Sequence, residues 1–440
     1  MYLAPRGVRP LGQAGAFVAG ADDFSALSYN PAGLARAGNS ALVDFGYSRH
    51  ITEYRRRVFA DSPELAAVQG TGMAMPLPAL GVTLAKVGSP AVNLGAGLWA
   101  PYPLLQNWPC DLSGHDPTPQ RYSICNYNGT AMATGGVGVA YRVDPRLTVG
   151  AAVHVLVGKL VTEVVLSVCD GAVCTQAENP DYDAAAQVAS SMLVSPALAL
   201  GATLEATPWL RLGFSAESGY WVSGDAELRV RLPTTALFAG AELDPASPRA
   251  RVRLRLPPMV RLGAEGHWGG SRAELAVVYE AWRVHDSIEV SADAVMRDVI
   301  ALGDYPVGTI RMDRGFRDAF SVRLGGELDG GQLAAGLVLR GGVMAERSAV
   351  PAEKLTAMNV DLNRLIVTLG VSYALSPKWS LEGVFAYVAM PATTVTTSTL
   401  LQTNATRPPW PGRTPVGNGV YQSQAEILGF GAKYAWQPLE

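Results

Sequence analysis

The chain has 440 residues, of which 48% are hydrophobic and 17% are charged, and its formal net charge is −3. The charged fraction lies below the roughly one quarter that soluble domains usually carry. The best candidate for a membrane-spanning helix, residues 87–105, is interrupted by proline, glycine and asparagine, so no such helix is expected. Basic residues gather only in Arg55–Arg57 and in the alternation over Arg249–Arg255, so a nucleic-acid partner is not expected.

The first forty residues hold the most informative motif. Residues 12–38 read GQAGAFVAGADDFSALSYNPAGLARAG, an apolar, glycine-rich start followed by an acidic pair and an Asn-Pro step. This segment resembles the signature of the FadL family, outer-membrane proteins that import long-chain fatty acids and other hydrophobic molecules. The resemblance implies that residues 1–40 form a hatch, or plug, inside a β-barrel built by residues 41–440.

The resemblance also implies which hatch residues are functional. They are the consecutive residues Asn30, Pro31, Ala32 and Gly33, which would form the gating core of the hatch. The local alternative for the same side chains is a simple helix cap, because asparagine accepts backbone N–H groups and proline suits a first helical turn.

After residue 40, apolar and polar residues alternate with the period of two that is typical of β-strands. Each segment has one apolar face and one small, polar face, as a transmembrane barrel requires with lipid outside and a wet lumen. In 365–373, for example, the apolar face consists of Leu365, Val367, Leu369, Val371 and Tyr373. We expect a 14-stranded antiparallel barrel with strands at 41–52, 76–86, 91–102, 129–143, 147–166, 190–206, 209–232, 250–267, 272–285, 315–328, 332–343, 361–375, 379–391 and 420–436.

Short turns and long polar loops alternate strictly between these strands. An even number of strands places the first and the last strand end on the same side of the membrane, and the short turns indicate that this side is the periplasm. The expected long loops are 53–72, 103–128, 167–189, 233–249, 286–314, 344–360 and 392–419. A soluble β-sandwich is the alternative. It explains neither the loops gathered on one side nor the aromatic residues near strand ends, which are Tyr373, Trp379, Tyr387, Tyr434 and Trp436.

The resemblance continues through the second half of the chain, in Val278–Trp282, Phe316–Gly325, Leu339–Gly342 and Tyr421–Tyr434. The last residues differ, because barrels of this family usually end on an aromatic residue, whereas Gln437–Glu440 follow the last tryptophan here. The first six residues lack the apolar core of a signal peptide. We interpret the chain as a mature protein of the bacterial outer membrane with an added Met, or as the product of a truncated gene start; a cytoplasmic protein is the alternative.

Four cysteines fall in two close pairs, each bracketing a polar segment. We expect two local disulfides, Cys110–Cys125 and Cys169–Cys174, in loops that face an oxidising compartment, although other pairings are possible. A zinc site that uses His115 is a less favoured alternative, because C-x-x-C spacing is lacking. We expect no metal, no cofactor and no enzymatic activity, since the five histidines are scattered and catalytic motifs are missing.

The resemblance implies a route for the substrate: an apolar groove among the outer loops, then a pocket inside the barrel, then a sideways exit through a distorted third strand. Candidate residues for this lateral opening are Gly95, Gly97, Trp99 and Pro101. Glycine often marks bulges and proline cannot donate to a strand ladder. An ordinary strand end, with Trp99 as an interface anchor, is the alternative.

Several cations point into the lumen in the expected registers, namely Arg323, Arg340 and Lys433 and also the alternating Arg251, Arg253 and Arg255. They are candidates for holding a ligand carboxylate. Alternatively they pair across the lumen with Glu327, Glu382 or the hatch residues Asp22 and Asp23.

These features together predict a monomeric outer-membrane barrel that imports hydrophobic small molecules by hatch-gated passive diffusion, with outer-membrane lipids around it. Burial of apolar groups, at about 0.8 kcal/mol per CH₂, would drive the transfer. A general porin is one alternative, and a structural or adhesive barrel whose plug only seals the pore is another. A fatty acid, an aromatic hydrocarbon and another lipid all stay open as ligands.

Overall fold

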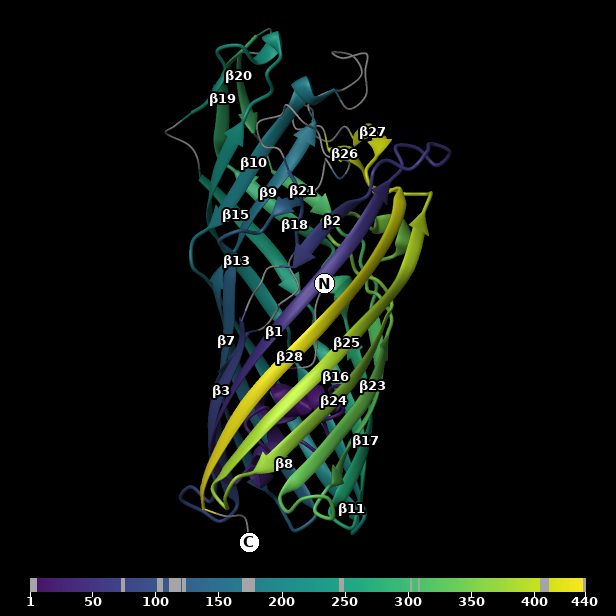
Figure 1. The fold of residues 1–440 in the computed structure, drawn as a ribbon. Helices are drawn as coiled ribbons and strands as arrows, with labels where there is room; N and C mark the ends of the chain where they lie inside the picture. Colours follow the sequence, from purple (N-terminus) through teal and green to yellow (C-terminus); the bar gives the residue numbers. More distant parts are fainter. Residues whose placement is uncertain are drawn as a thin grey trace.

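The computed structural model describes residues 6–72, 76–100, 106–110, 120, 124–167, 179–244, 249–300, 303–307, 309–403 and 411–437. Within these ranges, fourteen antiparallel strands form a closed ring in the order β1-β3-β4-β7-β8-β11-β12-β16-β17-β22-β23-β24-β25-β28, and β28 pairs back onto β1 (Figure 1). The predicted 14-stranded barrel is therefore confirmed. No helix in the described ranges has the length and apolar character needed to cross a membrane.

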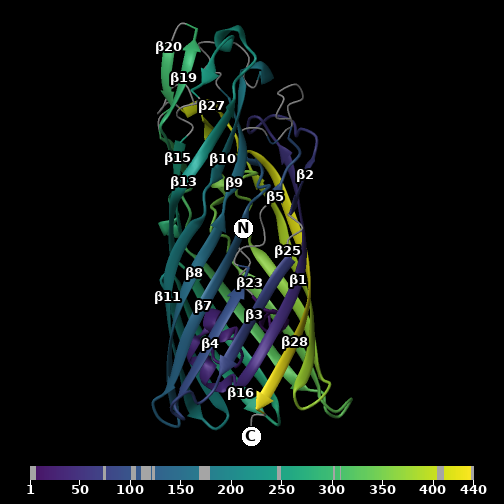
Figure 2. The same ribbon diagram turned by 90° about the vertical axis from the view of Figure 1, so that its left-hand side faces the viewer.

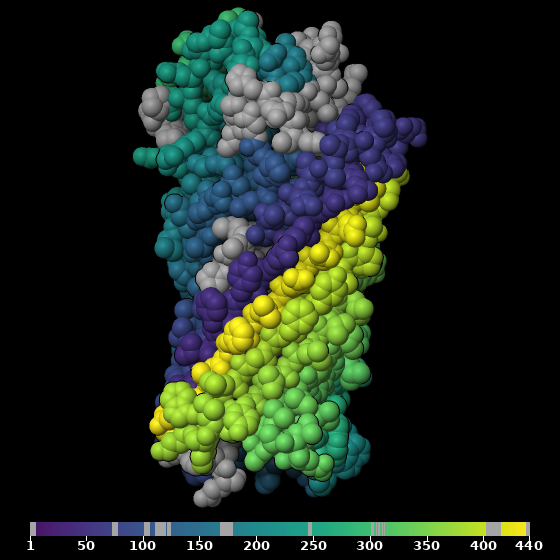
Figure 3. Space-filling view, in the orientation of Figure 1, coloured from purple at the N-terminus to yellow at the C-terminus, as the bar shows by residue number. Residues whose placement is uncertain are grey.

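The barrel strands are tilted and mostly long. Figure 3 shows β28 lying diagonally along β1, and their pairing runs from Asn39 with Gln437 to Arg56 with Gly419. The bounds of the ring are β1 Asn39–Arg56, β3 Pro76–Leu84, β4 Val92–Trp99, β7 Ala131–Arg142, β8 Leu147–Lys159, β11 Leu193–Thr207, β12 Leu210–Glu217, β16 Met259–Trp268, β17 Ser271–Glu280, β22 Ala319–Asp329, β23 Leu337–Glu346, β24 Arg364–Ala374, β25 Trp379–Val395 and β28 Gly419–Gln437.

The apolar face of each barrel strand points outward, where lipid replaces water. On β22, Val322 and Leu324 are exposed, whereas Ser321 and Arg323, which alternate with them, are buried in the lumen. At the end with the short turns, Trp379 packs against Tyr434, with ring centroids 4.8 Å apart. This barrel is therefore apolar outside and polar inside.

A second, seven-stranded sheet stands beyond the barrel rim, on the side of the long loops (Figures 1 and 2). We call it the extracellular sheet, because long loops of such barrels face outside. Its order is β21-β18-β15-β13-β10-β9-β6, with bounds β6 Ile124–Asn126, β9 Val161–Ser167, β10 Asp183–Ser190, β13 Tyr220–Arg231, β15 Arg249–Leu256, β18 Ser287–Ala292 and β21 Ile310–Asp313. The remaining strands are β2 Val68–Gly72, β5 Gln106–Asn107, β14 Glu242–Leu243, β19 Ala294–Val299, β20 Gly303–Val307, β26 Leu401–Thr403 and β27 Pro411–Pro415.

Three predicted strands are in fact pairs of strands. The spans 147–166, 209–232 and 250–267 each divide into one barrel strand and one strand of the extracellular sheet. The breaks fall at Leu160, at Ser218–Gly219 and at Pro257–Pro258, where Gly219 has a φ of 73° and the prolines cannot donate. The alternation continues on both sides of each break, so periodicity alone does not reveal it. Strands β10 and β18 to β21 also occupy segments predicted as loops.

The prediction that Arg251, Arg253 and Arg255 face the lumen is wrong. All three are exposed on β15, and the buried face of this strand carries Ala250 and Val252. The reason is that β15 belongs to the extracellular sheet, whose outer face meets water rather than lipid. The polar face therefore turns outward there.

The N-terminal segment, residues 6–38, lies inside the ring of strands (Figures 1 and 2). Its helix α1 contacts β1, β23, β24, β25 and β28, whereas its 3-10 helix η1 contacts β4, β7, β8 and β11. The segment therefore touches the wall on opposite sides. Helical bounds are α1 Val8–Gly12, α2 Ala26–Tyr29, η1 Pro31–Arg36, η2 Pro180–Tyr182, η3 Ala236–Phe238, η4 Trp282–Val284 and η5 Ala352–Lys354.

Candidate functional site

Asn30 holds the N-terminal segment both to itself and to the barrel wall. Its Oδ1 accepts the N–H of Ala32 at 3.2 Å, which caps η1. Its Nδ2 donates to the carbonyl oxygens of Val18 at 2.8 Å and of Ala202 on β11 at 3.1 Å. The helix-cap contact and the wall contact thus exist together, and the fully buried Asn30 has both side-chain groups satisfied.

The other three motif residues fill tight positions around Asn30. Pro31 and Ala32 lie against Gly150 of β8, where a β-carbon would come within 2.4 Å of the Ala32 nitrogen. A β-carbon on Gly33 would lie 2.3 Å from the carbonyl oxygen of Ala21. The motif therefore occupies space that only small or rigid residues fit.

Glu274 on β17 is a wall residue that the sequence reasoning missed. Its carboxylate accepts three consecutive backbone N–H groups, from Val18 at 2.6 Å, Ala19 at 3.1 Å and Gly20 at 2.7 Å. The alternation of residues along β17 could have predicted that Glu274 points into the lumen. It could not have predicted the partners of Glu274, because they lie more than 250 positions away in the chain. Three N–H bonds to one carboxylate fix the segment firmly to this wall.

An ion-pair cluster joins the same segment to the same part of the wall, on β17 and on its neighbours β22 and β23. Glu327 accepts from Arg9 at 2.8 Å, from Arg272 at 2.8 Å and from Arg340 at 2.6 Å. Asp22 pairs with Arg9 at 2.7 Å and with Arg272 at 3.1 Å. Burial alone would raise the pKa of Asp22, but the guanidinium groups of Arg272 and Arg9 lower it to about 2, so this carboxylate is ionised at neutral pH.

The structure places the predicted lumen cations at the level of the N-terminal segment. Arg340 is buried and forms an ion pair with Glu327, which is the alternative to ligand binding that the sequence left open. Arg323 is buried and donates to Ser321 Oγ at 3.1 Å and to the Gly15 carbonyl at 3.4 Å. Lys433 is partly buried near the end of β28. The side chains of Arg323 and Arg340 therefore bind groups of the protein itself in this structure.

The candidate residues for a lateral opening lie in a regular ladder. Strand β4 pairs with β3 and with β7 up to Trp99 without a register shift, so Gly95 and Gly97 mark no bulge. These glycines instead make room for Leu34 and Phe24, from which their β-carbons would be 2.6 and 2.7 Å away. Trp99 is buried against His154 rather than anchored at the membrane surface, and Pro101 lies outside the described residues.

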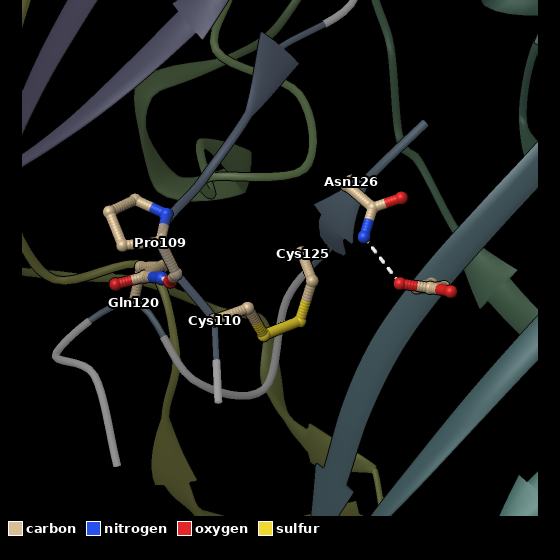
Figure 4. The surroundings of a disulfide bond; sticks show 6 residues. Pro109, Cys110, Gln120, Cys125 and Asn126 are labelled. Atoms are coloured by element: carbon tan, nitrogen blue, oxygen red, sulfur yellow. Dashed lines mark hydrogen bonds between the residues drawn. A yellow bond between two sulfur atoms is a disulfide. The ribbon is translucent and has the colours of Figure 1, made fainter. Parts of the chain in front are cut away.

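Cys110 and Cys125 form a disulfide with their Cα atoms 5.4 Å apart (Figure 4). The bond joins the residues after β5 to β6 at the rim of the barrel. Cys169 and Cys174 lie outside the described residues. Among the described residues, no group of three or more His, Cys, Asp or Glu side chains is placed to hold a metal ion.

A cavity of about 290 Å³ lies between the extracellular sheet and the rim of the barrel. Five strands of the sheet contribute to its wall, with side chains that include Val164, Val188, Leu228, Val252 and Val290. The polar lining residues include Tyr127, His285, Asn359 and Arg314. A smaller cavity of about 50 Å³ lies beside α1 and Trp99, and Ala100 borders both cavities.

One end of the large cavity is aromatic. The ring of His285 lies 5.1 Å from Phe316 and 6.0 Å from Trp282, measured between centroids. Burial and the nearby Arg314 lower the pKa of His285 to about 4, so the imidazole is neutral at pH 7. Its Nδ1 donates to the carbonyl oxygen of Arg255 at 2.7 Å.

The fold and these contacts define a transmembrane β-barrel with its own N-terminal segment inside the lumen and an apolar cavity at the outer rim. A family model described as outer membrane protein transport protein (OMPP1/FadL/TodX) matches residues 2–436. The chain belongs to this family of outer-membrane transporters for hydrophobic compounds, whose members are channels and transporters rather than enzymes. Its location is therefore the bacterial outer membrane.

Solved structures show the same fold at low sequence identity. A Pseudomonas aeruginosa FadL homologue is 15% identical over 99% of this chain and 100% of that chain, with a TM-score of 0.75. The P. putida toluene transporter TodX is 16% identical over 99% of both chains, with a TM-score of 0.68, and the Ralstonia pickettii toluene transporter TbuX is 15% identical over 98% and 99%, with a TM-score of 0.63. None of the curated proteins compared with the chain matches it.

Proposed function

We propose that this protein imports hydrophobic small molecules, such as long-chain fatty acids or similar lipophilic compounds, by hatch-gated passive diffusion as a monomer. The observation that carries the proposal is the apolar cavity at the rim, with the N-terminal segment filling the lumen below it. Binding pockets for small molecules are concave, largely apolar and furnished with a few polar groups, as this cavity is. Two of the similar structures are of toluene transporters, which also supports a lipophilic substrate.

The N-terminal segment is the hatch in this proposal. Its contacts with Glu274 and Glu327 on the neighbouring strands β17 and β22, together with those of η1 with β4, β7, β8 and β11 elsewhere in the ring, block a straight path to the periplasm. A lipophilic molecule would leave sideways, from the large cavity past Ala100 into the small cavity beside Trp99 and on into the membrane. Transfer out of water supplies the driving force, at about 0.8 kcal/mol for each CH₂ buried.

The test measures uptake of radiolabelled hexadecanoate and of toluene by Gram-negative cells whose own transporters for such compounds are deleted. The protein should raise uptake of at least one compound, and Val252→Trp, which fills the cavity, should reduce that uptake about ten-fold or more, because bulk in a packed site excludes the ligand. Val137→Trp on the lipid face is the matched control and should leave uptake unchanged.

Barrel assembly of each variant is checked by heat-dependent migration in gels. Correctly assembled protein that takes up neither compound would contradict the transport proposal and favour an adhesive or structural barrel whose hatch only seals the pore.

A further inference from the structure

Strand β15 rises from the rim of the barrel (Figure 1), and its outer face carries a row of arginines. Arg249, Arg251, Arg253 and Arg255 occupy every second position and are all exposed. Side chains two positions apart on one face of a strand are about 6.6 Å apart. Because the barrel strand β16 begins at Met259, Arg253 and Arg255 stand at the end of the row that is nearest the membrane.

These two arginines lack a carboxylate partner. Neither Arg253 nor Arg255 forms an ion pair with a residue that the structure describes. Glu289 lies directly across from Arg253 in the ladder between β15 and β18, but its carboxylate accepts from Arg311 at 2.8 Å. Farther from the barrel, Arg251 pairs with a carboxylate on β13 at 2.9 Å. The end of the row at the barrel therefore keeps two uncompensated positive charges.

An exposed tryptophan accompanies the two cations. Trp221 on β13 lies directly across from Arg255 and is 74% exposed. The Cζ atom of Arg255 lies 5.2 Å from the centroid of the indole ring, within the range of a cation–π interaction. Tryptophan prefers the interface between the hydrocarbon core and the headgroups of a membrane. Trp221 therefore indicates the level at which the lipid headgroups begin.

An apolar stripe on β11 runs beside the same residues. Ser195 Oγ on β11 donates to the carbonyl oxygen of Trp221 at 2.9 Å, which holds the two strands side by side. Val194 is 56% exposed, and Leu198 and Leu200, nearer the periplasm on β11, are also more than half exposed. An acyl chain can thus lie along β11 while the headgroup of the same lipid reaches the arginines of β15.

Two neighbouring cations at this level fit a phosphate group. A phosphomonoester carries a charge of about −1.5 to −2 at pH 7, and arginine binds phosphate oxygens in a bidentate geometry. The lipid A part of lipopolysaccharide carries phosphomonoesters directly above its acyl chains, in the leaflet that this face meets. The phosphodiester of phosphatidylglycerol carries a single charge and so compensates the two cations less completely.

We propose that Arg253, Arg255 and Trp221 form a binding site for lipopolysaccharide on the outside of the protein. The two guanidinium groups bind a lipid A phosphate, Trp221 packs at the level of the headgroup, and an acyl chain lies along β11. The opposite face of β15 lines the large cavity with Val252. The lipid site is therefore separate from the proposed transport path, and it does not depend on the proposed function.

Native mass spectrometry of the purified full-length protein in detergent micelles tests the site with three probes: diphosphorylated lipid A, its dephosphorylated form and phosphatidylglycerol. The wild type should bind diphosphorylated lipid A about ten-fold or more tightly than the other two, because hydrogen bonds between charged groups are strong. Arg253→Gln/Arg255→Gln should lose this preference. Arg229→Gln/Arg249→Gln removes two other exposed arginines of the extracellular sheet and is the matched control, which should keep the preference.

Four results would overturn the proposal. Equal binding of the two forms of lipid A by the wild type means that the face does not recognise phosphate. Equal affinity for phosphatidylglycerol means that any anionic lipid satisfies the face. An unchanged preference in Arg253→Gln/Arg255→Gln places the site elsewhere. The same weakening in both double variants means that only the net charge of the extracellular sheet attracts the lipid. Heat-dependent migration in gels checks that each variant has assembled its barrel.

Discussion

Single polar residues decide how the lumen is filled. Asn30 satisfies two carbonyl groups and one N–H group, and Glu274 satisfies three N–H groups, so the short helices of the N-terminal segment keep their backbone groups paired. Buried polar groups without partners are unfavourable by about 1–3 kcal/mol each. The same rule makes Arg314 conspicuous, because its guanidinium lacks a partner among the described residues.

Replacement of Asn30 by alanine is expected to lower the free energy of unfolding by about 1–3 kcal/mol, because the Val18 and Ala202 carbonyls lose their donor. Urea unfolding of the refolded barrel measures this change. The hatch should also loosen, so cells that carry Asn30→Ala should become more sensitive to a large hydrophilic antibiotic. The exposed Asn128→Ala serves as control, and equal sensitivity of the two variants would contradict a role of Asn30 in the seal.

At the scale of elements, inward-facing glycines let the wall and the N-terminal segment approach closely. A β-carbon on Gly81 of β3 would lie 2.2 Å from a ring carbon of Phe24, and one on Gly201 of β11 would lie 2.0 Å from Asn30 Oδ1. Real β-carbons essentially never come so near another heavy atom. Gly95 and Gly97 of β4 serve the same purpose, which explains why glycine in these strands does not mark a bulge.

Gly81→Ala is expected to destabilise the protein by about 1–3 kcal/mol, because Phe24 must shift to admit the methyl group. Gly135→Ala is a matched control on β7, since its β-carbon would meet nothing closer than 3.9 Å. The unfolding midpoints of the two variants in urea provide the comparison. A Gly81→Ala protein as stable as Gly135→Ala would show that the hatch packs less tightly against β3 than the structure indicates.

Across the whole molecule, the surroundings of each part determine which face is apolar. The barrel strands turn Val322 and Leu324 outward to lipid, whereas β15 turns Arg251 and Arg253 outward to water and buries Val252. The apolar face of the extracellular sheet thereby closes over the cavity at the rim, and the change in surroundings along the barrel axis accounts for this cavity.

A lysine at an exposed position should therefore affect stability in one part of the molecule and not in the other. Leu324→Lys, in the middle of β22, is expected to destabilise the barrel by about 2–4 kcal/mol, because it places a charge in the hydrocarbon core. Ser223→Lys, on the exposed face of β13, should be nearly neutral, because water solvates the ammonium there. Urea unfolding in lipid vesicles measures both, and equal effects would contradict the proposed membrane boundary between barrel and extracellular sheet.

Local pattern was enough to predict much of the barrel. The period of two in segments such as 365–373 predicts which side chains face lipid, because successive side chains of a strand point to opposite faces of the sheet. The motif around Asn30 likewise indicated the family from neighbouring residues alone. Periodicity failed at Gly219 and Pro257, because a strand that leaves the barrel keeps its alternation while its surroundings change.

The tertiary structure decided what the lumen and the cavity contain. Arg9 meets Glu327, which lies 318 positions away, because closure of the ring and insertion of the first residues bring them together. The same closure gives Arg340 a carboxylate partner and leaves Arg314 facing an apolar wall. Pairing and burial depend on contacts between distant segments, so the sequence by itself determined the strands of the wall, whereas the three-dimensional fold determined which charges are paired in the lumen and which side chains line the cavity.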